Sequence, residues 1–339
     1  MRKDRGSEKA VWPPSNAESK EDADEPTDFV ASVSTLRNQV ILVTGSAGLI
    51  GRWLIPRLQA AGAQIVRLDL QDPNGDGYGD ILDRAAVTAA LRDATGVVHL
   101  AAVSRVIWGE QAPDRCRAVN VDATAALLDA AATAPRRPWL LYASSREVYG
   151  QQDVLPVPED APLRPMNVYA KSKAAAEASV VAAQKAGMPA TILRFSSVYG
   201  DVHDHCDRVV PAFLRAAVTG GTLRVDGSRN GFDFTHASDV ADGITMAAAL
   251  MAGRETSVPP LHFVSGDCIR LGELAAMAVD LGGNSAARMI EAPTRDFDVQ
   301  MFQGDPTRAN AVLGWRIRTP LAVGLAQLAA AFRDSLAAR

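Results

Sequence analysis

The sequence predicts an α/β fold in which helices cover both faces of a doubly wound parallel sheet. Short apolar runs rich in β-branched residues recur along the chain, and Ala- and Leu-rich stretches of helix length separate them, an alternation typical of parallel sheets. The expected strands are residues 40–43, 64–68, 96–100, 139–143 and 191–195. The expected helices are residues 49–61, 83–92, 111–134 and 168–186. Because the runs are apolar throughout, we expect strands buried on both faces.

Length and composition agree with a globular protein. The 339 residues are 47% hydrophobic and 22% charged, which excludes a mostly disordered chain, a collagen-like repeat and a disulfide scaffold. The 39 acidic residues outnumber the 35 lysines and arginines, which gives a net charge of −4. A nucleic-acid-binding protein usually carries a basic excess, so we expect no nucleic acid partner.

Cysteine usage and the length of apolar runs bear on localisation. The three cysteines lie at scattered positions, which favours a reducing compartment. The longest apolar stretches, 244–252 and 321–332, are shorter than the roughly 18 residues that a membrane-spanning helix needs. No apolar targeting segment follows Met1. We therefore expect a soluble cytoplasmic protein without a membrane partner.

The first expected strand ends in a glycine-rich turn before a helix. Gly45, Gly48 and Gly51 follow the strand in the spacing G-x-x-G-x-x-G. A dinucleotide diphosphate needs backbone amides at close range and a helix N-terminus directed at its charge, and glycines permit the tight turn and the close approach. The turn predicts a dinucleotide-binding loop, with cofactor contacts from Gly45, Ala47, Gly48, Leu49, Ile50 and Gly51.

An aspartate at the end of the second strand indicates which dinucleotide is bound. Asp69 lies 18 residues beyond Gly51, where a carboxylate accepts hydrogen bonds from the adenosine ribose hydroxyls and repels a 2′-phosphate. We therefore expect NAD rather than NADP. Asp80 and Ile81 are expected near the adenine.

A tyrosine and a lysine one helical turn apart indicate chemistry at the same edge of the sheet. Tyr169 and Lys173 share one face of an expected helix. A phenol has a reference pKa of about 10, and a neighbouring ammonium lowers this pKa toward the working range of a base. Ser144 and Ser145 follow the strand 139–143, at the carboxyl edge where ligands bind in open α/β folds.

Together these motifs resemble the extended short-chain dehydrogenases/reductases, and in particular the NAD-dependent nucleotide-sugar epimerase/dehydratase family. The resemblance covers about residues 39–328 and rests on 44–51, Asp69, 99–102, Asn120, 144–150, Tyr169-x-x-x-Lys173 and 194–200. It implies a Rossmann-type sheet, a smaller, interleaved C-terminal substrate lobe, and NAD as cofactor. It also implies cofactor contacts from Leu100, Ala101, Ala102, Asn120, Tyr169 and Lys173.

The resemblance implies a division of labour among three catalytic side chains. Tyr169 takes the proton from a sugar hydroxyl, and Ser145 hydrogen-bonds the reacting oxygen. Lys173 holds the nicotinamide ribose and lowers the tyrosine pKa. Hydride passes to NAD, leaving a keto sugar, and is returned later, so the cofactor stays bound without net redox change.

The fate of a 4-keto sugar depends on the residues around it. Hydride return to the other face gives 4-epimerisation, loss of the C5 proton and the C6 hydroxyl gives 4,6-dehydration, and a C6 carboxylate permits decarboxylation. Dehydratases that the chain resembles carry a hydroxyl, an acid and a glutamate where this chain has Ser145, Arg146 and Glu147. Arginine stays charged and cannot readily donate a proton, so we expect a 4-epimerase. The alternatives are a decarboxylase or 4,6-dehydratase that uses Glu147 and, after these, an NAD-binding sensor without turnover.

The expected substrate contacts depart from the family pattern at two positions. Ser197 stands where the family often has Asn, and Phe232 stands where it usually has an arginine near the substrate diphosphate. Arg295 aligns with another arginine that grips the diphosphate. Arg146 either pairs with a uronate carboxylate or faces solvent, so hexose and uronate substrates both stay open. The full set of expected contacts is Ser144, Ser145, Arg146, Ser197, Arg208, Arg224, Phe232 and Arg295.

The chain divides into three expected units. These are a flexible polar tail at 1–36, a dinucleotide-binding domain at 37–201 and roughly 236–264, and a substrate-binding lobe at 202–235 and 265–335. The loop 203–207 has metal-ligand residue types, but consecutive residues seldom converge on one ion; we expect this loop to close over the substrate and expect no metal. The resemblance implies a homodimer through helices 111–134 and 168–186.

Overall fold

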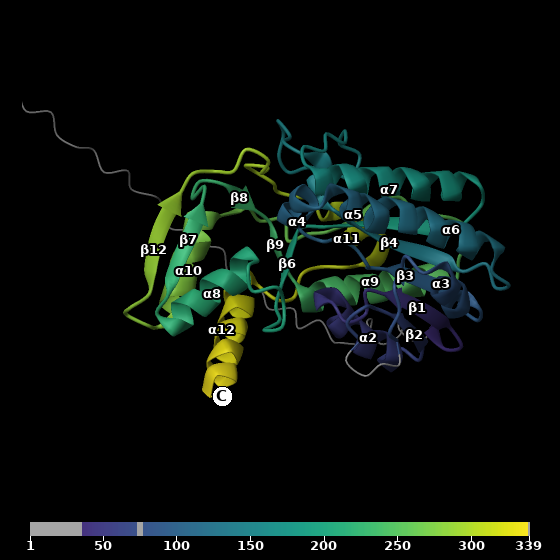
Figure 1. The fold of residues 1–339 in the computed structure, drawn as a ribbon, viewed down its shortest axis with the longest axis horizontal. Coiled ribbons are helices and arrows are strands. Elements are labelled where there is room, and N and C mark those ends of the chain that lie inside the picture. The colour runs from purple at the N-terminus through teal and green to yellow at the C-terminus, as the bar shows by residue number, and fades with distance from the viewer. Residues whose placement is uncertain (1–35, 73–76, 338–339) are drawn as a thin grey trace, which may run out of the picture.

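Six parallel strands form the central sheet, in the order β10-β5-β4-β3-β1-β2 (Figure 1). β1 pairs with both β2 and β3, so the strand order reverses beside β1, and open α/β folds bind ligands in the crevice at such a reversal. This computed structural model describes residues 36–72 and 77–337. Its sheet strands are β1 (Val40–Thr44), β2 (Gln64–Leu68), β3 (Gly96–His99), β4 (Trp139–Ser145), β5 (Ala190–Phe195) and β10 (Leu261–Phe263). The predicted doubly wound parallel sheet is confirmed.

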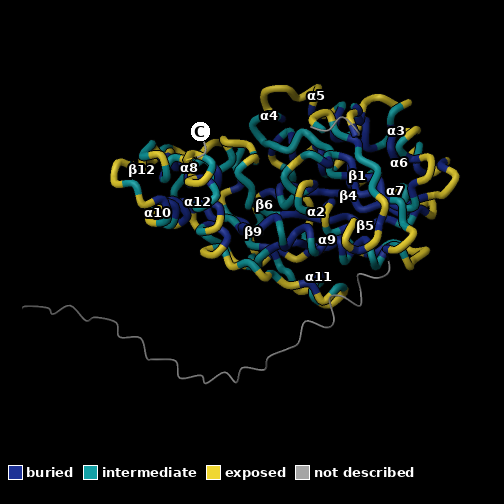
Figure 2. Tube along the Cα trace, turned by 90° about the horizontal axis from the view of Figure 1, so that it is seen from below, coloured by how far each residue is buried: buried dark blue, intermediate teal, exposed yellow. Residues whose placement is uncertain are grey.

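Helices cover both faces of the sheet (Figure 1). On one face lie α2 (Leu49–Ala60) and α9 (Ala237–Ala252), and on the other lie α3 (Arg84–Leu91), α6 (Ala123–Thr133) and α7 (Val168–Lys185). The buried residues follow the strands, whereas exposed residues follow the outer surface (Figure 2). Neighbouring residues of β1 show why: Leu42 packs in the core of one face and Val43 in the core of the other. The strand is apolar on both sides because both sides are covered.

The expected single helix at 111–134 is wrong, because the chain breaks at Ala112. The structure has α4 (Val106–Gln111), α5 (Pro113–Arg117), a π-helical turn (Ala118–Asp122) and then α6. Ala112 has a φ of −141° and a ψ of 69°, outside the helical region. The proline that follows disfavours the helical conformation of the residue before it, and this residue therefore separates two short helices.

A second lobe with its own apolar core lies beside the carboxyl edge of the sheet (Figure 1). Its main elements are α8 (Val209–Thr219), β7 (Thr222–Asp226), α10 (Leu271–Gly282), β12 (Arg288–Ala292) and α12 (Leu321–Ala337). β7 and β12 form a parallel pair. Short strand pairs connect the two lobes, namely β6 (Ser197–Tyr199) with β9 (Phe234–His236), and β8 (Gly231–Phe232) with β11 (Ile269–Arg270). The segment from 197 to 236 therefore leaves the sheet-bearing lobe, lines the second lobe and returns.

Two segments differ from the expected units. Helix α11 (Thr307–Leu313) and the residue Trp315 lie within the range expected for the substrate lobe, yet Ala309 and Trp315 are buried in the core beneath the sheet. The expected tail lies outside the described residues except for Leu36, which is fully buried in that same core. No helix within 36–72 or 77–337 is both long and apolar enough to span a bilayer.

A buried ion pair joins α7 to the carboxyl ends of β4 and β5. Arg194 donates to both carboxylate oxygens of Glu177, at 2.9 and 2.6 Å. Ser144 donates to the same carboxylate at 2.5 Å, and Arg194 Nη1 donates to the Tyr149 hydroxyl at 2.6 Å. All four residues are buried. The pair therefore fixes the end of β4 relative to the helix that carries Tyr169.

Removal of Glu177 should destabilise the fold strongly. We expect Glu177→Ala to lower the free energy of unfolding by about 3–5 kcal/mol, since it leaves the Arg194 charge buried without its carboxylate. Urea denaturation measures the change. The matched control is Asp160→Ala, which removes an exposed carboxylate paired with Arg308 and should cost less than about 1 kcal/mol. Equal losses in the two variants would contradict the role given to Glu177.

Candidate active site

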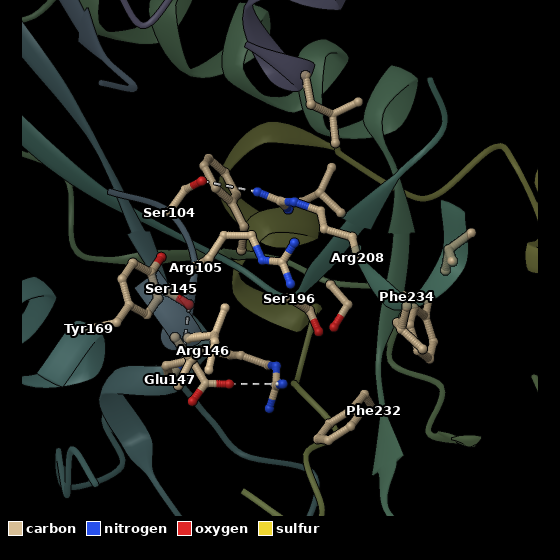
Figure 3. Close-up of a pocket in the computed structure, with 18 of the residues that line it drawn as sticks. Ser104, Arg105, Ser145, Arg146, Glu147, Tyr169, Ser196, Arg208, Phe232 and Phe234 are labelled. Atoms are coloured by element: carbon tan, nitrogen blue, oxygen red, sulfur yellow. Dashed lines mark hydrogen bonds and ion pairs between the residues drawn. The ribbon is translucent and has the colours of Figure 1, made fainter. Parts of the chain in front are cut away.

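A cavity of about 430 Å³ opens at the carboxyl edge of the sheet, between the two lobes. Its walls include the turn after β1, the end of β4, the first turns of α7 and the second-lobe segment 207–213. Figure 3 shows Tyr169 and Ser145 on one side of this cavity, Arg105 and Arg208 above them, and Phe232 and Phe234 on the far side. The cavity therefore brings together the glycine turn, the tyrosine helix and the arginines that the sequence singled out.

The glycine turn is shaped so that only glycine fits at two of its positions. Gly45 has a φ of 70°, and a Cβ there would lie 2.6 Å from the Ala101 backbone nitrogen. A Cβ on Gly51 would lie 2.3 Å from the Ser46 carbonyl oxygen. Helix α2 begins at Leu49, with Gly48 as its N-cap, and the turn lines the cavity. A phosphate group can approach these amides closely, so the turn fits a dinucleotide diphosphate.

Asp69 lies beside this turn and already holds it. Its carboxylate accepts hydrogen bonds from the Ala47 and Gln71 backbone amides, at 2.9 and 2.7 Å. Its position at the end of β2, next to the turn, fits the ribose contact expected from the sequence. The two residues expected near the adenine, Asp80 and Ile81, do not line the cavity. Asp80 accepts a hydrogen bond from the Leu82 amide, and Ile81 is buried in the core.

Asn120 stands behind the cavity wall rather than in it. Its side-chain amide accepts from Val103 N at 2.8 Å and donates to Val103 O at 3.0 Å and to Ser172 Oγ at 2.9 Å. It thereby fastens the segment after β3 to α7. Of the other expected cofactor contacts, Leu100 and Ala102 line the cavity, whereas Ala47 and Ala101 do not.

Helix α7 presents the tyrosine and the lysine from its first two turns. Asn167 caps the helix by accepting from the Ala170 amide at 2.7 Å. Tyr169 and Lys173 follow, both buried and both lining the cavity. Lys173 Nζ donates to the Ala143 carbonyl at 2.8 Å. Burial lowers the pKa of Lys173 to about 8, because a buried ammonium loses its hydration.

Burial works against ionisation of the tyrosine. It raises the pKa of Tyr169 to about 12, and the groups that oppose the rise are the Ser145 hydroxyl and the positive charge of Arg208. Arg208 is a cation that the sequence did not connect with this pKa. The sequence named Lys173, whose ammonium donates to the Ala143 carbonyl, and its effect on the tyrosine pKa stays a prediction. Sequence spacing could not reveal Arg208, because it reaches the tyrosine from the other lobe.

The turn after β4 (Arg146–Tyr149) carries a paired arginine and glutamate. Arg146 Nη2 lies 2.9 Å from Glu147 Oε1, and Asn167 Nδ2 donates to Glu147 Oε2 at 3.1 Å. Ser145 Oγ accepts from the Glu147 amide at 3.2 Å. The Arg146 side chain is 11% exposed and its guanidinium carbon lies 4.3 Å from the centroid of the Phe232 ring. The solvent-facing alternative for Arg146 is therefore wrong, because the aromatic residue of the second lobe covers it.

The second lobe supplies paired arginines to the same cavity. Arg224 Nε lies 2.8 Å from Asp226, and Arg295 donates to both oxygens of Asp298 at 2.6 and 3.0 Å. Arg208 Nη2 donates to Ser104 Oγ at 3.1 Å. All the expected substrate contacts line the cavity, namely Ser144, Ser145, Arg146, Ser197, Arg208, Arg224, Phe232 and Arg295.

Some residues of the site were missed by the sequence analysis. Arg105 forms an ion pair with Asp207, and both line the cavity, as does Asp298. Of the loop 203–207, Asp207 alone is part of that lining among the described residues. Asn167 carried a usable signal, since asparagine directly before an expected helix is a common N-cap. Arg105 carried no such signal, because its partner, Asp207, is distant in the chain.

Comparison with known proteins supports these assignments at the level of family and cofactor. Residues 41–258 match the NAD dependent epimerase/dehydratase family. The chain is 31% identical to a UDP-glucose 4-epimerase of Mycolicibacterium smegmatis, over 86% of this chain and 98% of that protein. It is 29% identical to a dTDP-glucose 4,6-dehydratase of an Actinoplanes species, over 86% of this chain and 97% of that one.

Solved structures agree with the sequence relatives. The fold is similar to that of MoeE5 in complex with UDP-glucuronic acid and NAD, with a TM-score of 0.80 and 29% identity, over 87% of this chain and 99% of that one. NAD is thus the cofactor found with structural neighbours, and the glycine turn of this chain fits it.

A methyl group at position 51 should weaken cofactor binding. We expect Gly51→Ala to bind NAD about tenfold or more weakly, because the new Cβ meets the backbone of the turn and displaces it. The measurement is the NAD released per protein on denaturation, followed by titration of the emptied protein. Gly253→Ala is the control, since a Cβ there meets nothing within 4 Å. Retention of full NAD content by the first variant would be against the assignment.

Proposed function

Since the chain belongs to the NAD-dependent epimerase/dehydratase family, we propose that it is a nucleotide-sugar 4-epimerase acting by transient oxidation at C4. The substrate is a nucleotide-linked hexose or uronate. The observation that carries the proposal is the meeting of Tyr169 and Ser145 in the cavity beside the glycine turn. Arginine at position 146 favours epimerisation over loss of water, because its guanidinium stays charged and does not readily give up a proton to a leaving hydroxide.

Tyr169 is the base of the proposed reaction. Its phenolate takes the proton of the C4 hydroxyl, and Ser145 donates a hydrogen bond to the same oxygen. NAD, when bound, supplies the acceptor for the C4 hydride and the donor that returns it. The charge of Arg208 favours the phenolate, and Lys173, which uses one donor on Ala143, has others left for the nicotinamide ribose.

Inversion requires that the 4-keto sugar present its other face before the hydride returns. Tyr169 then gives the proton back to O4, so substrate and product have the same mass. The wide cavity supports such a rotation, with Phe232 and Phe234 on the wall opposite Tyr169 (Figure 3). Arg224 and Arg295 hold the substrate diphosphate from the second lobe, where Phe232 lacks the guanidinium that the family usually has there.

A lyase reaction is the second candidate, because Glu147 lines the cavity. In that reading Glu147 takes the C5 proton and the chain is a 4,6-dehydratase, or the chain decarboxylates a uronate. Glu147 is engaged by Arg146 and Asn167, and acting as a base would require it to leave these partners. We therefore rank this function, and a sensor without turnover, below epimerisation.

Three further proposals concern assembly, domain division and location. We propose a homodimer through α6 and α7, supported by small exposed side chains on α7 at Ala175, Ala178 and Ala182, which allow close helix approach. We also propose that the chain divides into domains at about residues 201, 236 and 264. A cytoplasmic location is proposed from the cysteine usage and the short apolar runs of the sequence.

Loss of the tyrosine hydroxyl should abolish turnover. We expect Tyr169→Phe to lower kcat by about 10²–10⁴-fold, the range of general acid–base catalysis, while NAD stays bound. Mass spectrometry and proton NMR of UDP-glucose and UDP-glucuronate incubations identify the product. Unchanged mass with an altered C4 proton supports the epimerase, whereas loss of water or carbon dioxide assigns the lyase.

The control for this variant is Tyr78→Phe, which removes the hydroxyl of a tyrosine that is 70% exposed. It should leave kcat within about twofold of the parent, as expected for a surface change. Undiminished turnover in Tyr169→Phe would refute the proposed mechanism.

Loss of the Arg208 charge should move the pH profile of kcat upward. Because that charge favours the phenolate, Arg208→Gln raises the Tyr169 pKa and shifts the rising limb of kcat toward higher pH. Kinetics at saturating substrate from about pH 6 to about pH 10 measure the shift, because the pH dependence of kcat reports the groups that titrate in the enzyme–substrate complex. Arg224→Gln, which removes a cavity arginine that the proposed function assigns to the diphosphate, should raise KM and leave the limb in place. An unshifted limb in Arg208→Gln would show that the arginine does not act on the base.

A further inference from the structure

Arg146 retains a buried nitrogen that nothing in the described part of the chain satisfies. Nη2 pairs with Glu147, whereas Nη1 has no hydrogen-bond partner among residues 36–72 and 77–337. Buried guanidinium donors in folded proteins are normally satisfied. The residue also lines the cavity, so a ligand in that cavity can supply the missing acceptor.

The guanidinium is held in a fixed orientation. Its central carbon lies 4.3 Å from the Phe232 ring centroid and 5.5 Å from that of Phe302. The Glu147 carboxylate to which it bonds is itself fixed by Asn167. Figure 3 shows the pair on the same side of the cavity as Tyr169 and Ser145, with Phe232 beyond it. A fixed, planar group of this kind selects acceptors by geometry as well as by charge.

Position relative to the reacting carbon identifies the part of the sugar that reaches Arg146. Ser145, the preceding residue, lines the cavity together with Tyr169, and the proposed function places O4 of the sugar at these two side chains. C6 is joined to C4 through a single intervening carbon, C5. A substituent on C6 therefore lies next to the residues around O4, within reach of the side chain that follows Ser145.

The charges of the cavity favour an anionic substituent there. Each carboxylate in the cavity lining is paired with an arginine of the same lining, namely Glu147 with Arg146, Asp207 with Arg105, Asp226 with Arg224 and Asp298 with Arg295. Lys173 adds positive charge to this balanced set, whereas the charge of Arg208 is paired with Asp204, which lies outside the lining. Glu147 alone would repel a second carboxylate, but the Arg146 guanidinium already balances its charge. The ligand carboxylate would contact the same guanidinium, and a hydrogen bond between ionised groups is about twice as strong as one between neutral groups.

We propose that Arg146 binds the C6 carboxylate of a nucleotide uronate, which makes an acid sugar the preferred substrate. The inference rests on the proposed function, because it places O4 at Ser145 and Tyr169. It narrows the open choice between hexose and uronate to the uronate. Arg146 is then a specificity-determining residue, and its bond to Glu147 serves to hold the guanidinium ready for the ligand.

A double-mutant-type binding experiment tests the proposal, because it removes the charge from the ligand and from residue 146 separately and together. Calorimetry with NAD-loaded protein compares UDP-glucuronate with its neutral amide, UDP-glucuronamide, for the parent protein and for Arg146→Met. We expect the parent to bind the acid about 10- to 100-fold more tightly than the amide, as for a hydrogen bond between ions, and Arg146→Met to bind the two equally. Arg146→Lys, which keeps the charge, should restore part of the preference.

Arg295→Met is the matched control, because it removes a cavity arginine that the proposed function assigns to the diphosphate. Its affinity for acid and amide should fall by the same factor, so that their ratio stays as in the parent. Circular dichroism and NAD content confirm that each variant is folded, and if Arg146→Met fails to fold, the acid-to-amide ratio in the parent and in Arg146→Lys decides.

Three results would overturn the proposal. They are equal affinity of the parent for acid and amide, no binding of either ligand, and an unchanged acid-to-amide affinity ratio in Arg146→Met. The last result would mean that the arginine only holds Glu147 in place. Each is read from binding and does not depend on turnover. Failure of the proposed function is recognised separately, by the absence of a C4 epimer or by full activity of Tyr169→Phe.

Discussion

Desolvation of ionisable side chains at the carboxyl edge of the sheet governs the arrangement of the site. Removing a charge from water is unfavourable, so a buried ion persists only with a fixed partner. Glu177 meets Arg194, Glu147 meets Arg146, and the Lys173 ammonium meets the Ala143 carbonyl. Tyr169 is the exception, because its phenol is buried with groups that only partly offset the penalty on its anion. The fixed pairs hold the surrounding backbone, and the proposed reaction uses the phenol to exchange a proton.

The sequence predicted the sheet and the cofactor turn because both depend on local patterns. A strand buried on two faces must be apolar at consecutive positions, as Val40 to Val43 are, and a turn that approaches a diphosphate needs glycine at Gly45 and Gly51. The tyrosine and the lysine were visible for the same reason, since i and i+4 residues share a helix face. By contrast, the break at Ala112 was overlooked although Pro113 marked it, because the alanines around it favour a helix.

Contacts between distant segments could not be read from the sequence. Arg146 is covered by Phe232, which is far along the chain and belongs to another lobe. Arg208 acts on Tyr169, and Arg105 pairs with Asp207, only because the second lobe folds over the sheet edge. The sequence therefore named many of the side chains that line the cavity but did not connect Arg208 with the tyrosine. Local spacing fixes which residues share an element, whereas the partners of a charge depend on how elements from both lobes meet.

The hydrogen bond from the Ala47 amide to Asp69 bears on how the protein handles its cofactor. It holds the glycine turn in shape through the protein's own carboxylate, so the turn is ordered by contacts that do not involve the dinucleotide. A segment that is already ordered loses little conformational freedom on association, and more of the contact energy appears as affinity. Such preorganisation lowers the dissociation rate more than it raises the association rate. A slow dissociation suits the proposed reaction, whose reducing equivalent must stay with the protein between the two halves of the cycle.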